Sequence, residues 1–108
     1  MTTPSLLADI DTTVQELRRE ENASAFTHKL ARVVSAIGAI ADLPPQEVTA
    51  EAMVRLRELA DETVEAIERR IDTAGDIHTQ QRLAGTVYEI RRRMEVVETW
   101  FRHFTPGP

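Results

Sequence analysis

The sequence predicts an all-α fold: a small antiparallel bundle of three or four helices that ends in a long C-terminal helical hairpin. Apolar residues recur at intervals of three and four through most of the chain, which is the period of an amphipathic helix. The five prolines lie at the ends of these periodic stretches or between them, where helices stop. Of the 108 residues, 42% are hydrophobic and none is cysteine, so one small core must hold the fold without disulfides. We therefore expect a single domain over residues 1–108.

The C-terminal half carries the strongest helical pattern. One helix is expected at residues 49–74, with Thr49 as its N-cap and Gly75 as a left-handed terminator, and a second at residues 76–104. A link this short makes the two helices antiparallel neighbours. The second helix carries a coiled-coil heptad pattern. Its apolar positions alternate at intervals of four and three: Leu83, Val87, Ile90, Met94, Val97, Phe101 and Phe104.

Two further helical segments precede this hairpin, at residues 5–21 and 24–41. The apolar seam of the first is Leu7, Ile10, Val14 and Leu17, and that of the second is Phe26, Leu30, Val33, Ile37 and Ile40. The nine steps from Leu17 to Phe26, at about 100° each, place the two seams on opposite sides of a continuous helix. The chain either breaks near Asn22 or continues as one helix. No proline or glycine interrupts this region before Gly38, which favours the continuous helix. The first seam then needs a partner chain, and we predict a homodimer.

The face of residues 24–41 opposite the apolar seam carries small side chains around one histidine. A face that meets only water usually carries lysine, glutamate or glutamine. Gly38 costs about 1 kcal/mol relative to alanine inside a helix, which also indicates a close approach. We predict that another helix packs on this face, within the bundle or across a dimer interface. The residues that form it are His28, Ala31, Ser35 and Ala39.

The sequence around His28 resembles the histidine motif of phosphotransfer domains and of the dimerisation helices of histidine kinases. The shared positions are His28, Leu30 two residues later, Ile37 nine residues later, and the Gly38-Ala39 pair that follows. The resemblance covers about sixteen of the 108 residues. It departs at residues 31–32, where phosphotransfer domains usually carry Lys-Gly, and across residues 31–33, where kinases usually carry Arg-Thr-Pro. The resemblance implies a histidine phosphotransfer protein with His28 as phosphoacceptor, as an alternative to an interaction module.

The balance of charge disfavours nucleic-acid binding, because the formal net charge is −5 and a phosphate backbone is bound by basic surfaces. The one basic run, residues 91–93, fans around its helix and does not make a single patch. Folding at Gly75 is expected to bring it beside the acidic run of the preceding helix, so that the two runs neutralise each other. Otherwise either run is a solvated face or a charged partner surface. The acidic run is Glu58, Asp61, Glu62 and Glu65.

The residue types give little sign of catalysis or metal binding. The Glu-x-x-His ligand pair of di-iron bundles is missing, and so are a glycine-framed nucleophile and a phosphate-binding loop. The longest uncharged helical run, residues 33–41, is about half of a membrane span. Trp100 lies beside the heptad seam, and tryptophan is a residue type that dominates interfaces.

We therefore expect a cytoplasmic, non-enzymatic protein–protein interaction or oligomerisation module, such as an adaptor, scaffold or regulator, without metal or cofactor. It should form a homodimer and bind neither nucleic acid nor membrane. Its interface is expected on the first seam or on the small-residue face, with Trp100 as a further contact. The predicted interface residues are Leu7, Ile10, Val14, Leu17, His28, Ala31, Ser35, Ala39 and Trp100.

Overall fold

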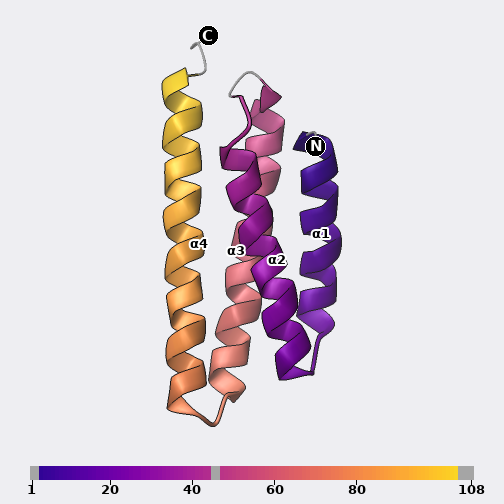
Figure 1. Cartoon of the computed structure of the whole chain (residues 1–108), viewed down its shortest axis with the longest axis vertical. Helices are drawn as coiled ribbons and strands as arrows, with labels where there is room; N and C mark the ends of the chain where they lie inside the picture. Colours follow the sequence, from indigo (N-terminus) through magenta and orange to yellow (C-terminus); the bar gives the residue numbers. More distant parts are fainter. Residues whose placement is uncertain (1–2, 45–46, 105–108) are drawn as a thin grey trace.

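The computed structural model describes residues 3–44 and 47–104, and this part of the chain folds into four helices and no strand. The helices lie side by side in a molecule of 49 × 22 × 18 Å (Figure 1). The predicted all-α antiparallel bundle is confirmed, and the helix ends lie within two residues of their expected positions. The helices are α1 (Thr3–Arg19), α2 (Ala23–Ala41), α3 (Ala50–Thr73) and α4 (Ile77–Phe104).

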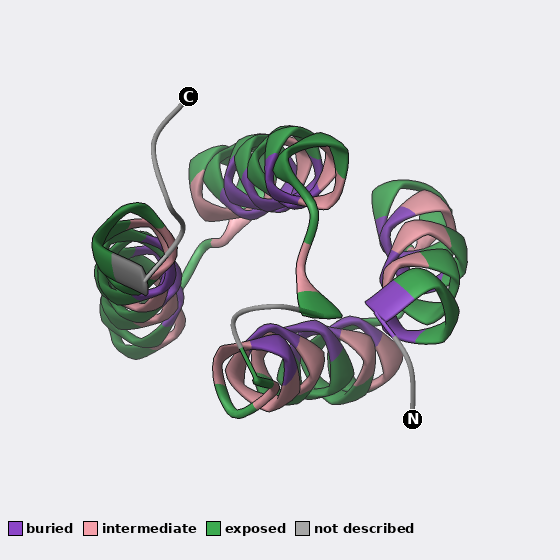
Figure 2. Ribbon diagram, turned by 90° about the horizontal axis from the view of Figure 1, so that it is seen from above, coloured by how far each residue is buried: buried purple, intermediate pink, exposed green. Residues whose placement is uncertain are grey.

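The bundle consists of two antiparallel hairpins, α1–α2 and α3–α4. The helices α2 and α3 lie diagonally opposite each other, and α1 runs parallel to α3 while α2 runs parallel to α4 (Figure 1). Seen along its axis, the order around the bundle is α1, α2, α4, α3, and each helix turns its buried side inward (Figure 2). Of the four neighbouring pairs, α2 and α4 pack least closely. The bundle therefore has one open side.

The C-terminal hairpin follows the sequence pattern. The Thr49 hydroxyl accepts a hydrogen bond from the Ala52 N–H at 3.0 Å, as expected of an N-cap. The left-handed terminator expected at Gly75 is wrong, because no glycine in the described part of the chain has a positive φ, and α3 ends at Ala74 in an extended conformation. The first five heptad positions of α4 are buried and Phe101 is half-buried, whereas the Phe104 side chain lies outside the described residues.

The continuous helix favoured for residues 5–41 is wrong, because the chain reverses at residues 20–22. Asn22 adopts an extended backbone, and its side chain accepts a hydrogen bond from the Ala25 N–H at 2.9 Å, which caps α2. The Glu20 carboxylate accepts from the Lys29 ammonium and from the Asn22 N–H, and these bonds hold the pKa of Glu20 below its ordinary value. Local polar groups therefore end one helix and start the next without proline or glycine.

A side chain from the second hairpin fixes this reversal. The guanidinium of Arg70 on α3 donates to the carbonyl oxygens of Glu20 at 3.0 Å and Glu21 at 2.8 Å. Its Cζ also lies 4.8 Å from the centre of the Phe26 ring, in a cation–π contact. Carbonyl groups that the end of α1 leaves without helical partners are thus satisfied by α3.

The reversal turns both N-terminal seams toward one core. Ile10, Val14 and Leu17 are buried together with the α2 seam, and Leu7 packs at the edge of the same core. The expectation that the first seam packs on a partner chain is therefore wrong. The first and second seams differ by half a turn in phase. Both reach the same core because α2 folds back against α1 instead of extending it.

The predicted pairing between the acidic run of α3 and residues 91–93 is also wrong. The four acids pair with arginines on α3 or α1: Glu58 with Arg55, Asp61 with Arg57, Glu62 with Arg18, and Glu65 with Arg69. Arg93 pairs with Glu89 one turn earlier on its own helix. Across the α3–α4 hairpin, an ion pair joins Arg57 to Glu98. Long charged side chains have several neighbours within reach, and nearby intrahelical partners satisfy most of them.

We expect the Arg70→Gln variant to lose about 2 kcal/mol of unfolding free energy, because two backbone carbonyls lose a charged donor. Arg69→Gln is the matched control. Arg69 is exposed, and among the described residues its ion-pair partner is Glu65 on the same helix, so its loss should stay below about 0.5 kcal/mol. Urea unfolding followed by circular dichroism measures both. Equal losses in the two variants would contradict the role given to Arg70 in the reversal.

Candidate interaction surface

The open side of the bundle is a groove between α2 and α4 with a volume of about 1030 Å³. Small side chains of α2 form one wall, and larger, mostly polar side chains of α4 form the other. We call this side of the molecule the α2–α4 face. The residues of the α2 wall include Ala31, Ser35, Gly38 and Ala39, and those of the α4 wall are Thr86, Glu89, Arg92, Arg93 and Val96.

Arg93 bridges the floor of this groove. A Cβ atom at Gly38 would lie only 2.5 Å from Nη1 of Arg93, so the guanidinium occupies the space that a side chain at this position would need. The Glu89 carboxylate accepts from Nη2 of Arg93 at 3.0 Å and from Nε at 3.2 Å, which holds the guanidinium in place. The close approach predicted at Gly38 is therefore made by an arginine of the same chain.

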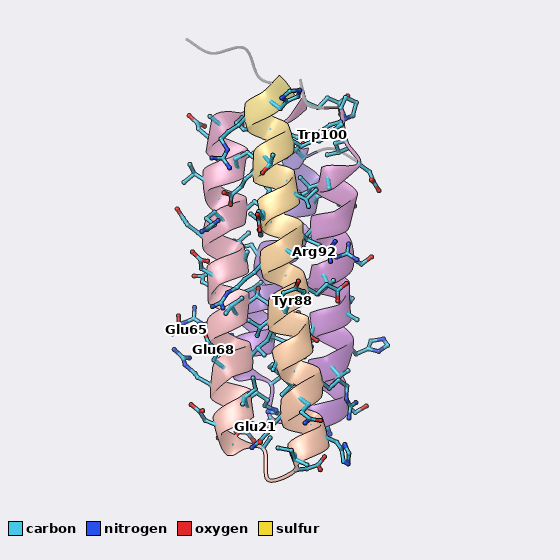
Figure 3. All side chains as sticks on the ribbon, turned by 90° about the vertical axis from the view of Figure 1, so that its left-hand side faces the viewer. Glu21, Glu65, Glu68, Tyr88, Arg92 and Trp100 are labelled. Atoms are coloured by element: carbon cyan, nitrogen blue, oxygen red, sulfur yellow. The ribbon has the colours of Figure 1, made fainter. Side chains whose placement is uncertain are left out.

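Large side chains stand along the exposed side of α4 at intervals of four, and two of them, Arg92 and Val96, line the groove. Tyr88 is 67% exposed, Val96 54% and Trp100 44%, and Arg92 is also exposed. Figure 3 shows Tyr88, Arg92 and Trp100 along the outer side of α4, with α2 beside it. We call these four residues the α4 ridge. Tyrosine, tryptophan and arginine are the residue types that contribute most to protein interfaces.

Two charged side chains of this face lack an ion-pair partner in the described part of the chain. Arg92 and Asp42 both line the groove, and neither forms an ion pair within the described ranges 3–44 and 47–104. Asp42 is the C-cap of α2, where the helix dipole is negative and a carboxylate is stabilised by a nearby cation. The face therefore offers one unpaired cation and one unpaired anion.

The structure places the predicted interface residues in four different environments. The first seam is in the core, as described above. Ala31, Ser35 and Ala39 line the groove, whereas His28 is exposed near the start of α2 and is not part of the groove wall. Trp100 lies at the far end of α4, beside a small apolar hollow of about 190 Å³ that Leu43 and Phe101 also line.

Sequence reasoning missed Tyr88, Arg92, Val96 and Asp42 as members of this face. A signal was present, because Tyr88, Arg92, Val96 and Trp100 repeat at intervals of four beside the buried heptad. The basic run that contains Arg92 predicts charge pairing across the hairpin instead.

In the described part of the chain, no three histidine, cysteine, aspartate or glutamate side chains gather in a way that would hold a metal ion. None of the helices described is both long and apolar enough to span a membrane. Comparison with protein-family models, with curated proteins and with solved structures finds no match to this chain.

Two glycine substitutions test how Arg93 is seated. We expect Gly85→Ala, in open space on α4, to raise the unfolding free energy by about 1 kcal/mol through helix propensity alone. Gly38→Ala should raise the unfolding free energy by less, because the added Cβ must displace the Arg93 guanidinium. In a protein that also carries Arg93→Ala, the two glycine substitutions should raise the unfolding free energy equally. Thermal unfolding measures all of these variants, and equal gains in the presence of Arg93 would show that the guanidinium does not rest on Gly38.

Proposed function

We propose that this protein is a non-enzymatic helical interaction module that forms a homodimer through the α2–α4 face and serves as an adaptor, scaffold or regulator. The observation that carries the proposal is the pairing, on one face, of a groove walled by small side chains with a ridge of large exposed ones. Protein interiors are close-packed, so a groove between two helices is an incomplete packing layer that a further helix can fill.

The size of the face suits a stable dimer. The molecule is 49 Å long and 18 to 22 Å wide, so a long side offers more area than the roughly 800 Å² that each partner buries in a standard interface. The exposed tyrosine, tryptophan and arginine on α4 would supply the energetically dominant contacts, and the polar edge of the groove would remain at the solvated rim. A dimer formed in this way leaves α1 and α3 free for other partners.

Histidine phosphotransfer remains the alternative, and one observation favours it: His28 is exposed on the outer surface of a helix in a four-helix bundle. Phosphorylated receiver domains supply the test. As an interaction module, the wild-type protein should take up no phosphate, and His28→Gln should dimerise as the wild type does. Phosphate transfer to the wild type but not to His28→Gln would establish the alternative.

Two matched replacements of alanine by arginine test the dimer. The wild-type protein should have twice the 12.2 kDa mass of the chain by light scattering. Ala31→Arg places a long cation in the groove and should give a monomer with an unchanged helical circular dichroism spectrum. Ala8→Arg makes the same change at an exposed position of α1 and should leave the dimer intact. A monomeric wild type, or a dimer that tolerates Ala31→Arg, would contradict the proposal.

A further inference from the structure

We infer that the two copies of the dimer are related by a two-fold axis parallel to the helices. The α4 ridge of each copy then packs against the groove of the other, and Arg92 pairs with the partner's Asp42. This inference rests on the proposed function, because it specifies how the dimer is built. It commits the α2–α4 face to a second copy of this chain.

The direction of the helices and the shape of the face distinguish the possible axes. A two-fold axis parallel to the helices places α4 of one copy opposite α2 of the other, twice over, so that large side chains meet small ones. An axis perpendicular to the helices would instead place α4 on α4 and α2 on α2. Because that axis reverses heights, large side chains of one α4 would meet large side chains of the other, while the small side chains of α2 would face each other across a void.

The charges on the face favour the same axis. Packing α4 on α4 would bring Arg92, near the middle of the helix, toward the partner's Arg92, and like charges facing each other oppose association. With the axis parallel to the helices, Arg92 faces the partner's α2 instead, where Asp42 is the unpaired acid. Both unpaired charges of the face are then neutralised in each copy.

The heights of the two residues along the bundle agree with this pairing. Asp42 lines the same hollow as Val96 and Val97, so the C-terminal end of α2 lies near the level of these α4 residues. Because α2 and α4 run parallel, Asp42 lies about one helical turn beyond the level of Arg92. A two-fold axis parallel to the helices leaves the position of each residue along the bundle unchanged. The partner's Asp42 is therefore also about one helical turn from the level of Arg92, a distance that an arginine side chain can span.

A charge-swap cycle tests the pairing. Arg92→Asp and Asp42→Arg should each weaken the dimer by about tenfold or more, because each creates a pair of like charges, and the double variant should return to within about threefold of wild type. Arg91→Asp is the control. Arg91 is the adjacent exposed arginine and lines the α3 side of the helix, so its loss should leave the dissociation constant unchanged. Sedimentation equilibrium measures the constants.

Cysteine cross-linking tests the axis independently, since the chain has no cysteine of its own. A mixture of Ala39→Cys and Val96→Cys proteins should oxidise mainly to the mixed disulfide dimer. A Val96→Cys protein that cross-links with itself more readily would overturn the parallel axis. The pairing would be overturned by single charge variants that behave like Arg91→Asp, or by a double variant that stays weak. If these outcomes appear while Ala31→Arg still abolishes the dimer, the inference fails and the proposed function stands.

Discussion

The reversal of the chain at residues 20–22 is the constraint on which the bundle depends. The two N-terminal seams differ by half a turn in phase, so they reach a common core only if α2 folds back on α1. Asn22 supplies the cap that starts α2, and Arg70 satisfies the carbonyl groups that the end of α1 exposes. The contact from Arg70 also ties the first hairpin to the second, so the turn and the packing of the two hairpins stabilise each other.

The arrangement of the two hairpins then determines which side of the bundle is closed. Between α1 and α3, Arg18 pairs with Glu62 and Arg55 with Asp11, over a buried apolar layer. Between α2 and α4, the wall from α2 consists largely of alanine, serine and glycine. Small side chains cannot fill the space between two helix axes, and the α4 arginine that reaches across fills only part of it. The groove is thus a direct result of the residues that α2 presents to α4.

The same choice of residues gives the face its shape and its charges. Most acids of α3 have an arginine partner, whereas Arg92 and Asp42 line the groove with no ion pair in the described part of the chain. An exposed ridge, a wall of small residues and one charge of each sign make the face complementary to itself. A self-complementary surface on a small bundle is the basis of an isologous dimer, and this is the reason for proposing a role in association.

Features set by neighbours along the chain were predictable from the sequence. The helix bounds, the Thr49 cap, the antiparallel C-terminal hairpin and the burial of Leu83 to Val97 follow from periodicity and short-range hydrogen bonds. The small-residue wall of the groove was also visible, because its spacing is a property of one helix.

Tertiary structure alone decided the rest. A continuous helix and a break at Asn22 both satisfy the local pattern, and the break is secured by Arg70, almost fifty residues away in the sequence. The partners of the acidic run depended on which arginines the packing brought within reach. The α4 ridge and Asp42 became one face only when α2 and α4 came to lie side by side, since a surface shared by two helices belongs to neither of them alone.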